Sequence, residues 1–110
     1  MKGPSRARFA EIYDQGQRAS RPLLSVRALP GTGQIGIAVS KSIGSHARRN
    51  RQRRRVRAAL AEFEAELQGL DVTVTVRQAA ETATSGEIAA ELRELIAEMR
   101  SRWANGSASD

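Results

Sequence analysis

Residues 35–57 read IGIAVSKSIGSHARRNRQRRRVR, and they set most of the architecture of this chain. The segment from Ile35 to Ser40 is apolar and rich in β-branched residues, which is typical of a buried strand. A short polar turn follows, and Ser45 stands where a helix N-cap is expected. We expect the helix to run to about Gln68, one residue before a glycine that can end it.

The residues that precede this segment predict one helix and one strand. Apolar spacing predicts a helix from Ser5 to about Gln15, which Gly16 would end. The segment Pro22–Leu29 reads as a strand, and the Pro-Gly-Thr-Gly sequence after it reads as a turn. We expect this strand to pair with the strand at residues 35–40 in a hairpin. Its candidate inward-facing residues are Leu23, Leu24 and Val26.

The residues that follow the long helix predict one more strand and one more helix. Val72, Val74 and Val76 alternate with threonines, as in a half-buried strand. Thr84 and Glu87 have the T-x-x-E spacing of a capping box, which predicts the start of a helix. One stripe of that helix is apolar and is expected to face the core: Ile88, Leu92, Leu95, Ile96, Met99 and Trp103.

The predicted order is helix, strand, strand, helix, strand, helix in a chain of 110 residues. This length suits one domain. The order predicts the α+β class, with the helices packed on one sheet as an α-β sandwich. We place the domain at residues 1–103 and expect residues 104–110, which are small and polar, to form a flexible C-terminal tail.

Basic and acidic residues are unevenly distributed along the chain. Residues 1–57 carry 14 basic and 2 acidic side chains, a net charge of +12, whereas residues 58–110 carry 4 basic and 10 acidic, a net charge of −6. A basic region of this strength predicts a polyanionic partner, and nucleic acid is the commonest. An anionic membrane surface is the alternative, but the arginine-rich segment lacks the apolar face that an interfacial helix buries in lipid.

Two further features narrow the class of protein. The chain has no cysteine, which excludes disulfides and thiolate metal sites. No apolar run approaches the roughly 20 residues that span a bilayer, and the N-terminus has no apolar stretch like that of a signal peptide. We therefore expect a soluble, cytoplasmic protein.

The segment Arg48–Arg57, RRNRQRRRVR, holds seven arginines in ten positions. At about 100° per residue, the apolar residues within and after it lie in one wedge of the helix: Val56, Leu60, Phe63 and Leu67. The same wedge, continued toward the N-terminus, meets Gln52, Arg53 and Arg49, so we expect no side of the first turns to be buried. The segment is predicted to project as a cationic rod, and arginine suits bidentate phosphate contacts and stacking on bases. The alternative is a solvated helix face.

Four segments form an ordered set of motifs. They are FAEIYDQG at residues 9–16, IGIAVSKSIG at residues 35–44, RNRQRR from Arg49 with Arg57 after it, and DVTVTVR at residues 71–77. This set resembles the signature of the ribonuclease P protein family: an F-x-x-V-[FY]-x-x-G helix, a strand ending in V-S-K-K-x-G, a helix opening with R-N-R-x-K-R-x-x-R, and a D-x-V-[VI]-x-x-R strand. The closing amphipathic helix is similar too, and the match covers nearly the whole chain.

The resemblance implies a role and a topology. In that family an RNA subunit cleaves precursor tRNA at the mature 5′ end, and the non-catalytic protein binds that RNA and the single-stranded 5′ leader. The magnesium that the reaction needs is expected to be bound mainly by the RNA subunit. Expected partners are therefore ribonuclease P RNA and precursor tRNA, with no membrane and no protein partner implied. The implied fold has a left-handed βαβ crossover through the long helix, similar to a domain of a small-subunit ribosomal protein.

The same resemblance assigns the candidate site residues. Phe9, Tyr13 and Lys41 are expected to bind the leader, in a cleft between the first helix and the sheet, although pattern alone would make the two aromatic residues core. Ser42 stands where the family has a second lysine, and Ser45-His46-Ala47 replaces the family's K/N-A-V. No cleft residue is carried over from the strand at residues 22–29. The residues expected to contact the catalytic RNA are Arg48, Arg49, Asn50, Arg51, Arg53, Arg54 and Arg57.

Two other functions stay open. A general structured-RNA-binding protein of similar fold would bind RNA without stimulating precursor cleavage. A self-sufficient endoribonuclease would need a catalytic group, and the acidic residues form no metal-binding motif. His46, the only histidine, has no carboxylate near it in the sequence, and we interpret it as a loop or phosphate-contact residue.

Overall fold

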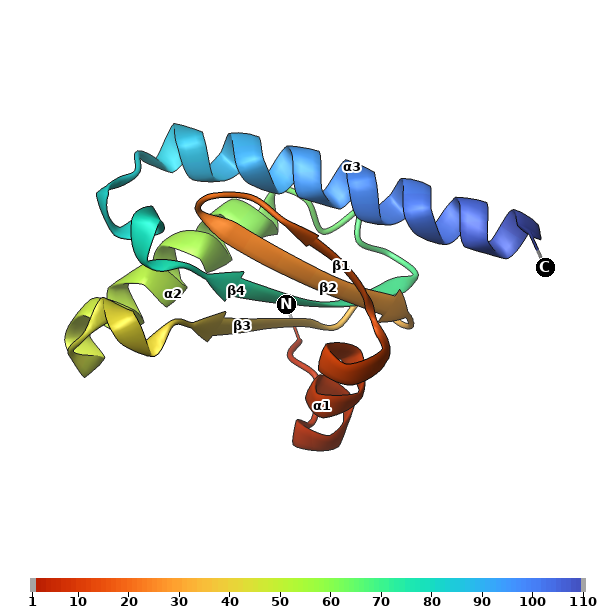
Figure 1. Cartoon of the computed structure of the whole chain (residues 1–110), viewed down its shortest axis with the longest axis horizontal. Coiled ribbons are helices and arrows are strands. Elements are labelled where there is room, and N and C mark those ends of the chain that lie inside the picture. Colours follow the sequence, from red (N-terminus) through yellow and green to blue (C-terminus); the bar gives the residue numbers. More distant parts are fainter. Residues whose placement is uncertain (1, 110) are drawn as a thin grey trace.

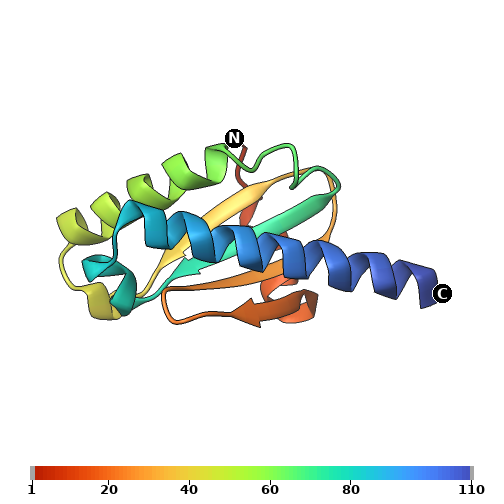
Figure 2. The same cartoon turned by 90° about the horizontal axis from the view of Figure 1, so that it is seen from above.

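The computed structural model describes the backbone of residues 2–109 and the side chains as far as Trp103. A sheet with the strand order β1-β2-β4-β3 separates two layers of helices, with α2 and α3 on one face and α1 on the other (Figures 1 and 2). The single-domain α+β class that the sequence predicts is confirmed. The elements, in chain order, are α1 (Arg6–Gln15), β1 (Gln17–Ser20), β2 (Leu24–Pro30), β3 (Ile35–Val39), the 3-10 helix η1 (Lys41–Ile43), α2 (His46–Ala61), β4 (Leu70–Val76), the 3-10 helix η2 (Gln78–Thr82) and α3 (Ser85–Ser109).

The apolar core lies between the sheet and the helices α2 and α3. Leu24 and Val26 face it from β2, as predicted, whereas Leu23 is only partly buried. The capping box is present: the Glu87 amide donates to Thr84 Oγ1 at 3.1 Å, and the Thr84 amide donates to a Glu87 carboxylate oxygen at 2.8 Å. The predicted stripe of α3 is fully buried except Trp103, which packs against the edge of the core: Ile88, Leu92, Leu95, Ile96 and Met99.

The predicted hairpin between residues 22–29 and 35–40 is wrong. β4 lies between β2 and β3, pairing antiparallel with β2 and parallel with β3. The hairpin partner of β2 is instead β1, which the sequence analysis missed because its four residues, QRAS, bury only Ala19. The Pro-Gly-Thr-Gly turn crosses the start of β4, where the Gly31 amide donates to the Gly69 carbonyl at 2.9 Å.

The connection from β3 through α2 to β4 is a βαβ unit between parallel neighbours. Seen from the side of α2 with the strands pointing upward, β4 lies to the left of β3, so the crossover has the uncommon left hand (Figure 2). The prediction that α2 continues to Gln68 is wrong, because the helix ends at Ala61 and turns follow as far as Gly69. Phe63 and Leu67 remain buried all the same, since these turns bring the chain back across the core to β4.

The strand β4 is more buried than the sequence predicts. Neighbouring strands lie on both of its sides and helices contact both of its faces, so Thr73 is as inaccessible as the valines next to it. At the other end of the chain α3 is helical to Ser109, and the flexible tail stays a prediction whose last residue, Asp110, lies outside the described residues. None of the helices described within residues 2–109 combines the length and the apolar character that a membrane span requires.

Candidate nucleic-acid interface

The first candidate surface is a groove beside α1, on the face of the sheet opposite α2 and α3. The Ser5 hydroxyl caps the helix by accepting the Arg8 amide, and Ile12 is the one fully buried residue of the helix. Phe9 is half-buried over β3, where a Cβ added to Gly36 would come within 2.9 Å of Phe9 Cε2. The absence of a side chain at Gly36 therefore lets the phenyl ring rest on the strand.

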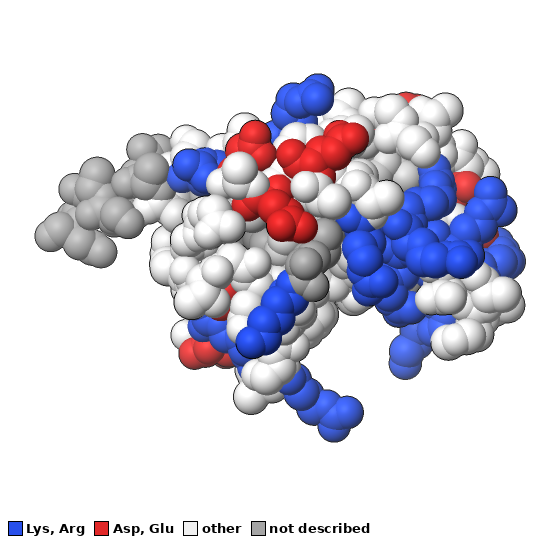
Figure 3. Space-filling view, turned by 180° about the vertical axis from the view of Figure 1, so that it is seen from behind, with Lys and Arg blue, Asp and Glu red and all other residues white. Residues whose placement is uncertain are grey.

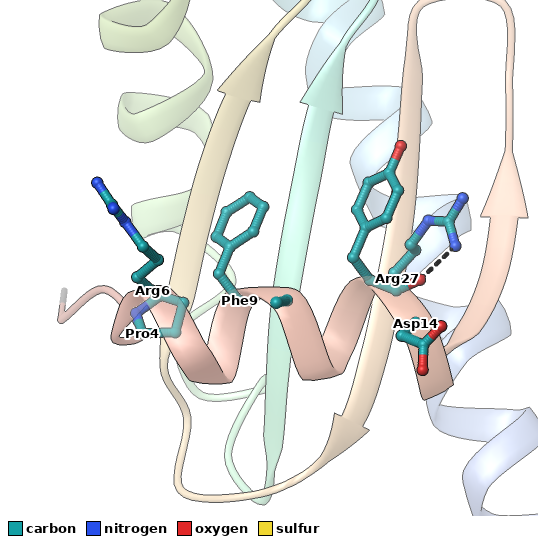
Figure 4. Close-up of a pocket in the computed structure, with 7 residues that line it drawn as sticks. Pro4, Arg6, Phe9, Asp14 and Arg27 are labelled. Carbon is teal, nitrogen blue, oxygen red and sulfur yellow. Dashed lines mark hydrogen bonds between the residues drawn. The ribbon is translucent and has the colours of Figure 1, made fainter.

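The groove presents two aromatic rings from consecutive turns of α1. Phe9 extends from the helix over the strands (Figure 4). Tyr13, one turn further along the helix, keeps 49% of its surface exposed. A tyrosine with this much exposed surface is not part of the core. Its flat, accessible ring can stack on an unpaired base. The residues that line the groove are Pro4, Arg6, Phe9, Ala10, Tyr13, Asp14 and Arg27.

Arg27 is a groove residue that the sequence analysis did not identify. It comes from β2, its guanidinium lies 3.9 Å from the centre of the Tyr13 ring, and its Nη1 donates to the Tyr13 carbonyl at 2.6 Å. Strand alternation contained the signal, because Arg27 follows the inward-facing Val26 and must face the other side of the sheet. The sequence did not indicate that α1 packs on that side of the sheet.

The orientation of α1 is fixed by a buried carboxylate at the start of β4. Asp71, which is 3% exposed, accepts the amides of Thr32, Gly33 and Gln34 on Oδ1 at 2.9–3.1 Å, and Oδ2 accepts Arg8 Nε at 2.8 Å. Burial by itself raises the pKa of Asp71, but the backbone hydrogen bonds and Arg8 outweigh it and hold the pKa below its usual value. The ionised carboxylate thus fastens the helix that forms the groove to the sheet.

Lys41, predicted to bind the leader with Phe9 and Tyr13, does not line the groove. It is exposed in η1, directly after β3, whose early residue Gly36 lies under Phe9. β3 therefore leads from the groove past Lys41 to the N-terminus of α2. A single-stranded nucleic acid that contacts both the aromatic rings and Lys41 therefore has to run along β3.

The second candidate surface, called the arginine surface below, is the exposed side of α2. Figure 3 shows Lys and Arg side chains gathered at the end of the molecule where α2 lies. Ser45 caps the helix by accepting the Arg48 amide at 3.3 Å. None of its arginines other than Arg48 forms an ion pair within the described part of the chain. The predicted residues that compose it are Arg48, Arg49, Asn50, Arg51, Arg53, Arg54 and Arg57, of which Arg49 and Arg53 are half-buried and the others exposed.

The prediction that the first turns of α2 form a free cationic rod is wrong. Gln52 is 3% exposed, and Arg55 donates to Gln52 Oε1 at 2.7 Å and to the carbonyls of Ala80 and Ala83 in and after η2. Glu81 in η2 also pairs with Arg48 through two hydrogen bonds of 2.6 Å. One side of the helix is thus packed against η2, a segment too distant in sequence for helix periodicity to reveal.

The polar groups of the two candidate surfaces are mainly hydrogen-bond donors. Within the described residues no group of three or more His, Cys, Asp or Glu side chains is arranged to hold an ion. His46 is exposed as the first residue of α2. The two candidate surfaces offer cations, hydrogen-bond donors and aromatic rings, which are the groups that bind nucleic acid.

Comparison with known proteins shows which family this chain resembles. The family model described as Ribonuclease P matches residues 4–100. The ribonuclease P protein component of Xanthomonas oryzae pv. oryzae is 36% identical over 87 residues, which cover 76% of this chain and 60% of that protein. That of Gluconacetobacter diazotrophicus is 31% identical over 97 residues, covering 83% of this chain and 84% of that protein. The chain thus spans about 60% of the length of the Xanthomonas relatives.

Solved structures show the same fold. The ribonuclease P protein from Thermotoga maritima superposes with a TM-score of 0.77 at 20% identity, covering 87% of this chain and 94% of that one. A Staphylococcus aureus ribonuclease P protein has a TM-score of 0.77 at 25% identity, with coverage of 89% and 95%. The family match over residues 4–100, together with relatives above 30% identity, shows that the chain belongs to the ribonuclease P protein family.

Proposed function

We propose that this protein is the RNA-binding subunit of a ribonuclease P, and that it assists the removal of the 5′ leader from precursor tRNA without carrying the chemistry itself. The observation that carries the proposal is the presence of two distinct surfaces, one cationic and one aromatic, connected by β3. A folded, highly charged RNA suits the cationic surface, and the single-stranded leader of a second RNA suits the aromatic one.

The arginine surface is the proposed contact for the catalytic RNA. Its unpaired guanidiniums neutralise phosphates, and the N-terminus of α2 adds a preference for anions. Neutralising phosphates lowers the repulsion within the folded RNA, so the RNA needs less magnesium to fold. That magnesium is bound mainly by the RNA in this proposal, and no step depends on a metal held by the protein.

The groove is the proposed contact for the leader. Single-stranded RNA exposes its bases, and stacking on an aromatic side chain contributes roughly 1–3 kcal/mol per base. Tyr13 offers one ring face, because Arg27 covers the other at 3.9 Å, and Phe9 and Lys41 extend the path along β3. Stacking and phosphate contacts give little base preference, so the groove is expected to accept leaders of many sequences.

The discriminating experiment is leader cleavage of a precursor tRNA at low magnesium. A bacterial ribonuclease P RNA alone, the protein alone and the two together are compared. Cleavage that requires both supports the proposal, and salt-sensitive RNA binding without stimulation would indicate a general RNA-binding protein. Cleavage by the protein alone would indicate an independent endoribonuclease.

A further inference from the structure

The pair between Arg48 and Glu81 places a carboxylate within the arginine surface. Arg48 Nε donates to Glu81 Oε2 and Arg48 Nη2 donates to Glu81 Oε1, each at 2.6 Å. This two-point geometry is the one by which a guanidinium binds a phosphate. Arg48 keeps 58% of its side chain exposed, whereas Glu81 keeps 18%, so the carboxylate is the more anchored member of the pair.

Glu81 cannot easily move away from the surface. The carbonyls of Ala80 and Ala83, on either side of it in the chain, both accept hydrogen bonds from Arg55 of α2. Ala80 is itself fully buried. The hydrogen bond and the charge of Arg48, together with the charge of Arg51, keep the pKa of Glu81 low, so the carboxylate is ionised at neutral pH.

We propose that Glu81 is a specificity-determining residue that occupies Arg48 as a phosphate would, and so excludes RNA backbone from that part of the arginine surface. The inference rests on the proposed function, since it concerns the same surface. Arg48 therefore differs from the other predicted RNA contacts. It already binds a carboxylate, so replacing that carboxylate with an RNA phosphate adds no new ion pair.

The effect is a selection against unrelated RNA. Binding without recognition is made of phosphate contacts alone, in any register along the backbone. A fixed negative charge repels any RNA backbone that crosses its position. An RNA whose shape leaves that position empty keeps its full affinity. Repulsion aimed at wrong partners is a general means of specificity.

The test measures how RNA affinity depends on salt. Two probes are used, a bacterial ribonuclease P RNA and poly(U) of fixed length, with wild type, E81Q, E81D and the double variant R48A/E81Q. E81Q is expected to bind poly(U) more tightly at low salt, with a log–log salt slope steeper by about 0.7, the value for one additional phosphate on a single strand. Its affinity for poly(U) then falls about threefold more than that of wild type between 50 and 200 mM salt.

Three controls assign the effect to the pair. E81D keeps the charge and should keep the wild-type slope, and R48A/E81Q should return to it because the released cation is gone. Glu66→Gln removes the same charge from the turns beyond the other end of α2 and should leave the slope unchanged. Thermal unfolding confirms that each variant is folded, and E81A replaces E81Q if the latter is not.

The outcomes separate this inference from the proposed function. Equal slopes for wild type and E81Q, or weaker poly(U) binding by E81Q, would overturn the inference while RNA binding by wild type is intact. An equal gain of affinity for both probes would also overturn it, because the selectivity would be unchanged. Wild-type protein that bound neither probe would overturn the proposed function and the inference with it.

Discussion

Arg8 of α1 and Asp71 of β4 join two elements that are 63 residues apart in the sequence, with Arg8 Nε 2.8 Å from Asp71 Oδ2. The other oxygen of the carboxylate binds the turn between β2 and β3, so one buried side chain connects a helix, a turn and the central strand. A Cβ at Gly31 would come within 2.2 Å of this carboxylate, which shows how closely the turn surrounds it. The geometry of the groove depends on this connection.

Removal of the Asp71 carboxylate is predicted to destabilise the protein. Asp71→Ala leaves three backbone amides and Arg8 Nε without their acceptor, which costs about 2–4 kcal/mol for a buried charged acceptor. Urea unfolding measures the change. The matched control is Glu11→Ala, which removes the exposed partner of Arg8 on the same helix and should have a much smaller effect. Superimposable unfolding curves for wild type and Asp71→Ala would contradict the connection.

The same carboxylate predicts how stability depends on pH. Because its pKa is lower in the folded state than its ordinary value of 3.8, its contribution is complete above that value and is lost as the pH falls through the folded pKa. The melting temperature is therefore expected to fall on acidification below about pH 4. Asp71→Asn should show a smaller fall. What remains belongs to Glu81 and Glu98, whose pKa values are lowered by arginine partners, and to Glu87, whose pKa is lowered by its capping hydrogen bonds with Thr84. An identical fall in both proteins would refute the assignment.

The parts of the fold that local pattern controls were predictable. The stripe of α3, its capping box and the helix from Ser5 follow from spacing within a few residues, and all three are present. The pairing of strands was not predictable in this way. The position of β4 between β2 and β3 depends on the crossover through α2, which only the family resemblance indicated.

The candidate site shows the same division. Phe9, Tyr13 and the exposed arginines were identified from sequence, whereas Arg27 in the groove and Glu81 beside Arg48 depend on contacts between distant segments. Glu81 lies 33 residues from Arg48, so no search for helix partners at i±4 could find it. The separation of α2 and η2 in the sequence also explains why the side of α2 at Gln52, which is buried, was predicted to be exposed.

Gly36 is predicted to set the position of Phe9. A methyl group at this position would meet Phe9 Cε2 at 2.9 Å and Pro4 Cδ at 3.2 Å, so Gly36→Ala must displace the ring from β3. We expect this variant to bind precursor tRNA several-fold more weakly, with little change for mature tRNA, since only the precursor has a leader to stack. Gly86→Ala is the matched control, because its added methyl group meets nothing closer than 3.9 Å. Unchanged discrimination in Gly36→Ala would show that Phe9 does not contact the leader.

Arg54 is predicted to contribute one phosphate contact to the binding of ribonuclease P RNA. It is exposed on α2 and forms no ion pair within the described residues. Arg54→Ala should reduce the log–log salt slope by roughly 0.7–0.9, the value for one neutralised phosphate. Arg18→Ala removes the same charge from β1, the strand at the far edge of the sheet from β3, and should leave the slope unchanged. A slope that falls equally in both variants would mean that only net charge matters.

The substitution Ser42→Lys is predicted to strengthen the binding of precursor tRNA. Ser42 is exposed in η1 next to Lys41, and its hydroxyl lies 2.7 Å from that of Ser40, whose side chain also caps η1 through the Ser42 amide. Because the cap uses the backbone of residue 42, Ser42→Lys keeps it while adding a positive charge at the end of β3. If the leader follows β3 from Phe9 to this point, Ser42→Lys tightens the binding of precursor tRNA by about threefold, the gain from one phosphate contact. Mature tRNA, which has no leader, should bind as before. Ser101→Lys adds the same charge on α3 and controls for general attraction, so an equal gain for precursor and mature tRNA in Ser42→Lys would place the leader elsewhere.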